Sequence, residues 1–106
     1  MWKVAALLAL AACQSFDVSR VLGAECGSDS DCAEKCLAGQ AWPAGFCTTV
    51  CDDDSQCGGG ARCISEDGGV CVFDCTIDSD CLFLGSTYTC QSVSASSGQV
   101  MVCRGG

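Results

Sequence analysis

The spacing of the cysteines is the strongest constraint on this chain. Thirteen cysteines occur in 106 residues, and the last twelve fall into three groups of four. Unit 1 contains Cys26, Cys32, Cys36 and Cys47; unit 2 contains Cys51, Cys57, Cys63 and Cys71; unit 3 contains Cys75, Cys81, Cys90 and Cys103. The first gap is always five residues, and three residues join one unit to the next. Such a period predicts three copies of one small structural unit.

We expect these cysteines to form disulfides rather than bind metal. The chain has no histidine, and no two cysteines stand in a Cys-x-Cys or Cys-x-x-Cys pattern, although zinc sites and redox motifs use such close pairs. Large apolar side chains are sparse between Cys26 and Cys103, so burial alone cannot offset the entropy of folding. Four cysteines per unit allow three pairings, and these stay open. No cofactor is expected.

The second half of each unit is predicted to be a β-hairpin. In unit 2, residues 61–65 and 69–73 flank Asp67-Gly68, a strong turn signal. In unit 3, residues 87–93 and 99–104 flank a serine-rich loop, and in unit 1 the loop is 42–45. The expected fold is small and disulfide-rich, with little regular secondary structure. Three tandem loop-and-hairpin units, 26–50, 51–74 and 75–106, would form a short rod.

An acidic pattern repeats inside the first gap of each unit. The three gaps read GSDSD, DDDSQ and TIDSD. Side chains of this kind accept hydrogen bonds from nearby backbone amides in turns. In unit 1 we expect a helical turn that runs through Lys35, with Asp31 and Glu34 spaced as in a capping box. The alternative is calcium, for which carboxylates are suitable ligands. The calcium candidates are Asp29, Asp31, Asp54, Asp78 and Asp80.

The N-terminus has the pattern of an export signal. Residues 4–12 form an apolar run of nine, which is too short to span a bilayer and fits the apolar region of a signal peptide. The run ends in Leu10-Ala11-Ala12-Cys13, which resembles the lipobox of bacterial lipoproteins. The resemblance implies that residues 1–12 are a signal peptide removed by cleavage, and that Cys13 carries acyl chains that anchor the protein. Gln14 after the cysteine then favours the outer membrane.

Residues 13–25 are expected to be a flexible tether between the lipid and unit 1, about 20 Å long. The competing prediction is ordinary secretion, with cleavage after Ala24. Both predictions remove Cys13 from the pairing pool. Twelve cysteines then remain, an even number that can close into disulfides.

The cysteine spacing of unit 2, Cys51-x5-Cys57-x5-Cys63 with aspartate in the first gap, resembles the second half of whey acidic protein domains. It is also similar to Dickkopf-type cysteine-rich repeats. The resemblance implies that the first cysteine of each unit pairs with the third and the second with the fourth. The implied disulfides are Cys26–Cys36, Cys32–Cys47, Cys51–Cys63, Cys57–Cys71, Cys75–Cys90 and Cys81–Cys103.

Composition excludes several functions. Without histidine, the usual base that activates a serine or cysteine nucleophile is missing, and no deep cleft for a small-molecule substrate is expected in so small a chain. We therefore predict that the protein is not an enzyme. The net charge is −8, which argues against nucleic acid as a partner.

A structural or protein-binding module of the cell envelope is the expected function. The aromatic and apolar side chains that we expect to contact a partner, or else to pack over a disulfide, are Trp42, Phe46, Leu82, Phe83 and Leu84. Two alternatives stay open. The resemblance to whey acidic protein domains suggests a secreted protease inhibitor, with residues 37–46 as the inhibitory loop. The repeated aspartates suggest a calcium-dependent domain.

Overall fold

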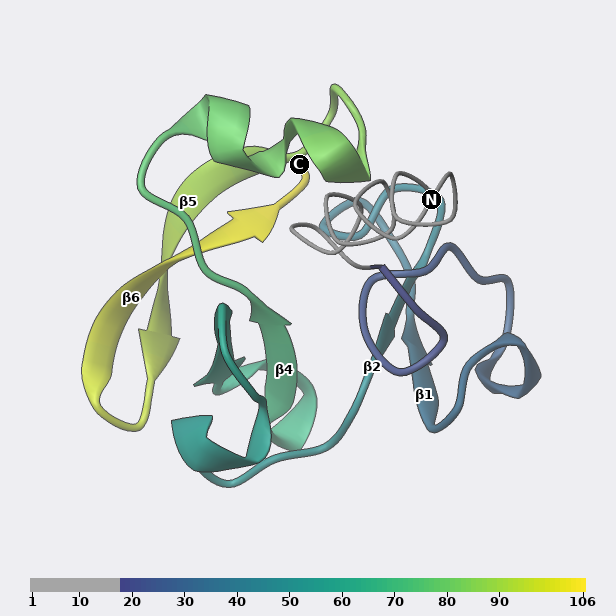
Figure 1. Cartoon of the computed structure of the whole chain (residues 1–106), viewed down its shortest axis with the longest axis horizontal. Coiled ribbons are helices and arrows are strands. Elements are labelled where there is room, and N and C mark those ends of the chain that lie inside the picture. Colours follow the sequence, from purple (N-terminus) through teal and green to yellow (C-terminus); the bar gives the residue numbers. More distant parts are fainter. Residues whose placement is uncertain (1–17) are drawn as a thin grey trace, which may run out of the picture.

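Three β-hairpins and four short 3-10 turns make up the part of the chain that the structure describes. The computed structural model describes residues 18–106, and the hairpins follow one another along the chain (Figure 1). The strands are β1 (Lys35–Leu37), β2 (Phe46–Thr48), β3 (Ala61–Ile64), β4 (Val70–Phe73), β5 (Thr89–Ala95) and β6 (Gly98–Arg104). The 3-10 turns are η1 (Asp29–Asp31), η2 (Asp54–Gln56), η3 (Glu66–Gly68) and η4 (Asp78–Leu84). The expected small disulfide-rich fold with three hairpin units is confirmed.

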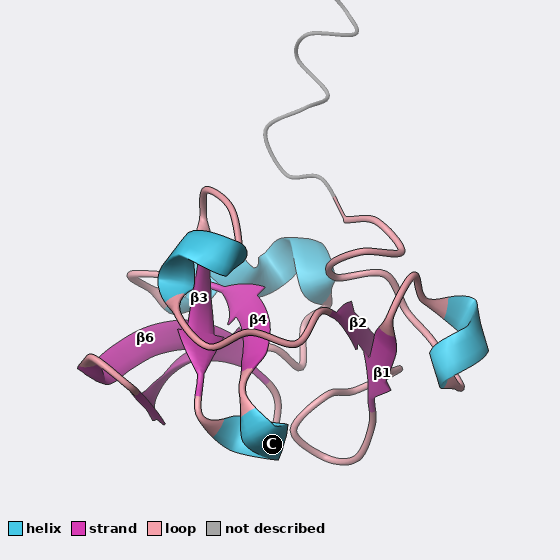
Figure 2. Ribbon diagram, turned by 90° about the horizontal axis from the view of Figure 1, so that it is seen from below, coloured by secondary structure: helices cyan, strands magenta, loops and turns pink. Residues whose placement is uncertain are grey.

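Each hairpin is an antiparallel pair that forms its own two-stranded sheet. The third and fourth cysteines of every unit lie directly opposite each other in the ladder, as Cys63 lies opposite Cys71 in unit 2. A two-stranded ribbon of this size is marginal in water without further support. Figure 2 shows the 3-10 turns beside the strands. Disulfides from Cys32 after η1, Cys57 after η2 and Cys81 within η4 connect three of these turns to the second strand of their hairpin.

All six disulfides follow one rule. The first cysteine of each unit bonds to the third, and the second bonds to the fourth. The Cα–Cα distances are 5.8–6.0 Å for the first kind and 5.3–5.4 Å for the second. This is the pairing that the resemblance to whey acidic protein domains implied. It fastens each loop to both strands of its hairpin and leaves no disulfide between units.

Two local expectations need correction. The helical turn of unit 1 ends at Asp31, and Lys35 lies in β1, because the Glu34 carboxylate accepts the backbone amide of Val50 instead of capping the turn. In unit 3 the strands extend into the serine-rich loop, since Ala95 pairs with Gly98 and only Ser96-Ser97 is left as the turn.

The three units share one apolar core. Its buried members come from every unit: Leu37, Trp42 and Phe46, then Ile64, Val70 and Val72, then Tyr88 and Val102 with Cys81 and Cys103. Burial of this surface is the main apolar contribution to stability. Because the units share this core, they do not fold as independent units.

Unit 3 also contacts unit 1 directly, which a simple rod does not allow. The Tyr88 hydroxyl donates to the Pro43 carbonyl at 3.1 Å, and the Gly105 amide donates to the Ala41 carbonyl at 2.8 Å. The arrangement is therefore more closed than the expected rod. The three-residue joints between the units gave no indication of this closure, because it depends on contacts between residues that are far apart in the sequence.

Glycine is required at two equivalent points. A Cβ at Gly45 would lie 1.9 Å from the Cys26 carbonyl oxygen, and one at Gly69 would lie 2.2 Å from that of Cys51. Both glycines have positive φ, which disfavours any other residue. In units 1 and 2 the first cysteine and the hairpin therefore approach more closely than a side chain would permit.

Tyr88 links units 1 and 3 and gives a clean pH test. Burial raises the pKa of Tyr88 to about 12, and the negative charge of Glu25 adds to the effect. An unfolded tyrosine has a pKa of about 10, so the folded state holds the proton more tightly. This contribution to stability is complete below about pH 10 and is lost as the pH rises toward 12.

Tyr88 is the one tyrosine of the chain, so phenolate absorbance reports it alone. We expect a native midpoint about two units above that of the reduced, unfolded protein; equal midpoints would contradict the burial.

Candidate functional site

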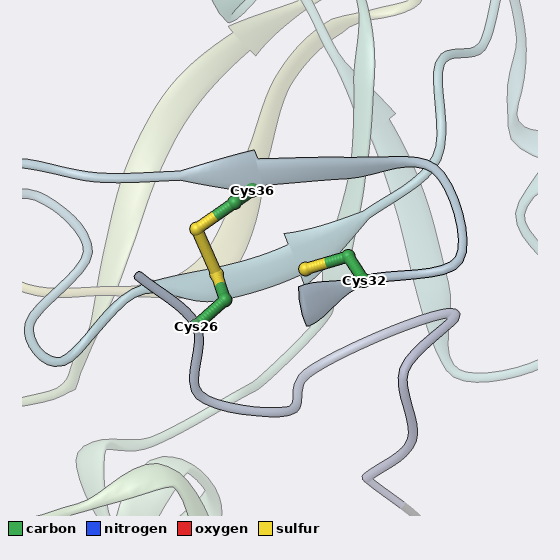
Figure 3. Close-up of side chains that lie close together, drawn as sticks. All are labelled: Cys26, Cys32 and Cys36. Atoms are coloured by element: carbon green, nitrogen blue, oxygen red, sulfur yellow. A yellow bond between two sulfur atoms is a disulfide. The ribbon is translucent and has the colours of Figure 1, made fainter. Parts of the chain in front are cut away.

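The sulfur atoms of each unit gather in one small volume. The Sγ atoms of Cys26, Cys32 and Cys36 lie within 4.8 Å of one another, and Figure 3 shows the Cys32 sulfur beside the Cys26–Cys36 bond. Units 2 and 3 have similar clusters, formed by their first, second and fourth cysteines. Every sulfur in these clusters belongs to a disulfide. None of them is therefore a thiolate, the form in which cysteine binds a metal ion. The clusters serve as crosslinks between the loop and the hairpin.

The first repeated aspartate has the same role in all three units. Its Oδ1 accepts the backbone amide of the third cysteine, at 2.9 Å from Asp29 to Cys36, 2.8 Å from Asp54 to Cys63 and 2.9 Å from Asp78 to Cys90. The aspartate therefore fixes the loop against the first strand of the hairpin next to the disulfide.

The residue before the second cysteine closes the turn on its other side. In unit 1, Asp31 Oδ2 accepts the amides of Gly27 and Ser28. Gln56 and Asp80 accept the corresponding pairs of amides in units 2 and 3. In unit 3 the amides of Thr76 and Ile77 lower the pKa of Asp80. Glutamine can replace aspartate here because an amide oxygen accepts the same two bonds.

These contacts support the turn role of the calcium candidates. All five carboxylates, those of Asp29, Asp31, Asp54, Asp78 and Asp80, have oxygens engaged by backbone amides of their own unit. A calcium ion needs six to eight oxygens around one point. Within residues 18–106, the groups of possible ligands that converge consist of cysteine sulfurs.

Removal of one repeated aspartate tests this role. Asp78→Ala should lower the free energy of unfolding by about 1–2 kcal/mol, since the Cys90 amide loses its charged acceptor. Asp78→Asn should retain most of the stability. Asp52→Ala is the matched control, because it removes the same charge from an exposed position of unit 2. Thermal denaturation with and without millimolar calcium completes the test: a rise of several degrees with calcium would restore the calcium hypothesis.

The aromatic side chains of unit 1 are in the core rather than on the surface. Trp42 is 3% exposed and Phe46 is fully buried, and their ring centroids are 5.3 Å apart. Phe46 also contacts Phe73 and Tyr88 of the other units. As surface contacts for a partner, Trp42 and Phe46 are therefore excluded by their burial. Their role is the packing alternative, since the shared core is thicker than one unit suggests.

The loop expected for a protease inhibitor is turned, not extended. The backbone amide of Trp42 donates to the Gly39 carbonyl, and the amide of Gly45 donates to the Trp42 carbonyl, which makes two consecutive turns. Ala44 has a φ of 66°. The C-terminal Gly105 covers Pro43. An inhibitory loop must present extended backbone to a protease, and residues 37–46 do not have that shape.

The apolar triplet of unit 3 lies at the end of η4. Leu82 is 59% exposed, whereas Phe83 and Leu84 are half-buried. Phe83 packs edge-on against Phe73, with centroids 5.1 Å apart. Of the predicted contact residues, Leu82 is the one that presents most of its side chain to solvent.

The segment before unit 1 is part of the fold, contrary to the expected tether. Within residues 18–25, Leu22 packs against the core. The Gly23 amide donates to the Cys47 carbonyl at 2.8 Å, and the Cys47 amide donates to the Ala24 carbonyl at 2.9 Å. The sequence gives little sign of this, because the bonds come from the backbone and Leu22 is the sole apolar anchor.

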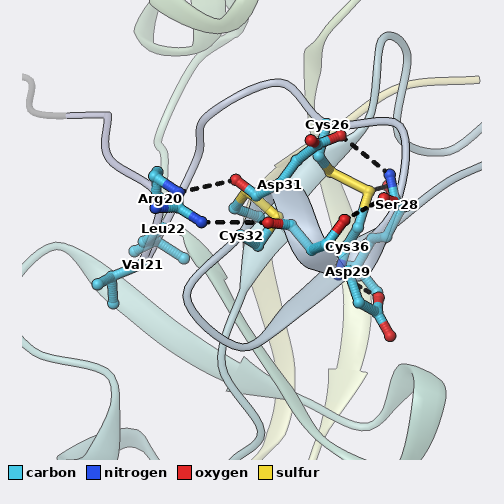
Figure 4. The surroundings of a disulfide bond; sticks show 12 residues. Arg20, Val21, Leu22, Cys26, Ser28, Asp29, Asp31, Cys32 and Cys36 are labelled. Atoms are coloured by element: carbon cyan, nitrogen blue, oxygen red, sulfur yellow. Dashed lines mark hydrogen bonds between the residues drawn. A yellow bond between two sulfur atoms is a disulfide. The ribbon is translucent and has the colours of Figure 1, made fainter.

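Arg20 fastens the same segment to η1. Its guanidinium donates to the carbonyls of Ser30 and Asp31 at 3.2 and 3.0 Å (Figure 4). The Arg20 carbonyl in turn accepts the Ala33 amide at 2.8 Å. Residues 18–24 therefore cover the first disulfide loop as an additional strap.

Cys13 and the expected signal peptide, 1–12, lie outside the described residues, as does the tether before residue 18. Among the helices of the part that the structure describes, none has the length and apolar character to cross a bilayer. No protein-family model matches the chain, and no curated protein or solved structure shows significant similarity to it.

Proposed function

We propose that this protein is exported and anchored in the bacterial envelope, in the outer membrane, by a lipid on Cys13. Its folded domain then serves as a structural or protein-binding module at the membrane surface. Six disulfides indicate an oxidising compartment outside the cytoplasm. The lipid anchor on Cys13 and the location in the outer membrane are the further parts of the proposal.

The strap formed by residues 18–24 is the observation that carries the proposal. Cleavage after Ala24 would remove Leu22 from the core and both backbone partners of Cys47, a fully buried residue. Cleavage before Cys13 leaves all these contacts in place. The structure of the domain therefore favours the lipobox over the secretory cleavage site.

The shape of the domain supports a binding or structural role. Two disulfides per unit and a shared core hold the surface in one conformation, and a preorganised surface loses little entropy when it binds. The mature chain has four basic and thirteen acidic residues, which keep a tethered domain soluble and favour a cationic partner.

Substitution of Cys13 tests the anchor. In the bacterial host, the parent protein should remain with the membrane fraction in high salt and take up labelled fatty acid. Cys13→Ser should abolish both properties, because the thioether cannot form. Ser15→Ala is the matched control beside the lipobox and should change neither. A soluble parent protein without label would overturn the proposal.

A further inference from the structure

Exposed apolar side chains surround the point at which the chain joins the domain. Val18 is 47% exposed and Leu82 is 59% exposed. Phe73 lies near the segments that carry both residues: a Cβ at Gly23 would lie 2.9 Å from a Val18 methyl and 2.7 Å from the Phe73 ring, and Phe73 packs against Phe83, which follows Leu82 in η4. We call the surface formed by Val18, Phe73 and Leu82 the anchor-side face.

The two ribbon views agree on this arrangement. The end of η4 lies beside the segment that begins at residue 18 in both Figure 1 and Figure 2. The turn between β5 and β6 lies far from it in Figure 1, because seven-residue strands extend about 20 Å from the disulfides that hold η4. The end of η4 and the segment that begins at Val18 therefore lie at the other side of the domain from the β5–β6 turn.

The joining segment offers one cationic group, that of Arg20, to a membrane surface. Arg20 is the one charged residue within 18–24, and the acidic Asp17 and Glu25 stand on either side of this segment. The Arg20 guanidinium donates to two backbone carbonyls, and the ion pairs found among residues 18–106 involve other arginines. A cation at this position complements lipid phosphates.

The lipid attachment point is close. Val18 is five positions after Cys13, and a fully extended chain covers at most about 3.6 Å per residue, or about 18 Å here. This step rests on the proposed function, because it requires the anchor on Cys13. With the anchor in the bilayer, the anchor-side face stays within reach of the headgroups.

We propose that the anchor-side face rests on the lipid surface, with Val18 and Leu82 in the headgroup region. The turn between β5 and β6 then points away from the membrane, toward a partner in solution. The partner of this face is thus a phospholipid surface.

Tryptophan placed on either end of the domain tests the orientation. The chain from Cys13 onward has one cysteine outside its six disulfides, so a maleimide-linked dialkyl lipid can be coupled to Cys13 in vitro. Leu82→Trp and the matched Ser96→Trp are then compared in vesicles of zwitterionic phospholipid with brominated acyl chains. The unsubstituted protein gives the background of buried Trp42.

We expect about two-fold or stronger quenching of the Leu82→Trp emission and almost none for Ser96→Trp. Equal quenching of both variants, or stronger quenching of Ser96→Trp, would overturn the proposal. So would concentration-dependent self-association of the parent that Leu82→Ser abolishes, since a second copy would then cover the face. The chemical anchor makes this result independent of whether cells lipidate Cys13, which the Cys13→Ser experiment decides.

Discussion

Loss of the Cys81–Cys103 disulfide is expected to destabilise the fold by about 3–4 kcal/mol, more than loss of Cys26–Cys36. The first bond closes a separation of 22 residues and the second a separation of 10, and the entropy removed from the unfolded chain grows with that length. Cys81 and Cys103 are also fully buried members of the shared core, so their removal leaves a cavity.

The measurement compares two double variants in urea at neutral pH. Cys81→Ala with Cys103→Ala removes the core disulfide, and Cys26→Ala with Cys36→Ala is the matched control. The control should lose about 2–3 kcal/mol, because its sulfurs are half-buried. If the control lost as much free energy of unfolding or more, the shared core would not depend on the Cys81–Cys103 disulfide of unit 3.

Removal of the strap is the second large effect. A chain that begins at Glu25 should be less stable than one that begins at Gln14 by about 3–5 kcal/mol. The buried amide and carbonyl of Cys47 lose their partners, each at a cost of about 1–3 kcal/mol. The core also loses the half-buried Leu22 side chain.

Thermal denaturation of the two chains measures this effect. Within the longer chain, Leu22→Ala should destabilise the fold, while Val21→Ala should leave it nearly unchanged because Val21 is 52% exposed. If the two chains melted at the same temperature, the strap would be dispensable. A mature protein that starts at Glu25 would then be plausible.

The units themselves could be predicted from the sequence, because the signals for them are local. A five-residue gap with an aspartate, a turn signal such as Asp67-Gly68 and the alternation of strand residues all act within about 25 residues. The residues left three pairings open in each unit, and the resemblance to whey acidic protein domains selected the one observed. The Gly-x-Cys pattern at Gly45 and Gly69 repeats in units 1 and 2 and was a usable signal for the close approach to Cys26 and Cys51.

The packing between units could not be predicted, because no local sequence pattern indicates which residues of different units are in contact. For Trp42 the sequence left two alternatives open, contact with a partner or packing over a disulfide, because unit 1 alone is too thin to bury it. Phe46 and the neighbouring Tyr88 of unit 3 supply the core that decides for packing. The strap was missed for a related reason, since its bonds to Cys47 come from backbone groups that every residue has. Sequence reasoning thus gives the crosslinked units, and long-range contacts decide how they close.

The intact mass of the native protein extracted from membranes, before and after reduction and alkylation, tests the central claim most directly. We predict a chain that begins at a lipid-modified Cys13 and takes up no alkylating reagent until it is reduced. After reduction, twelve cysteines should react, those of the six disulfides. An unlipidated chain beginning at Glu25, or free thiols or bound metal in the native protein, would contradict the account of an anchored six-disulfide domain.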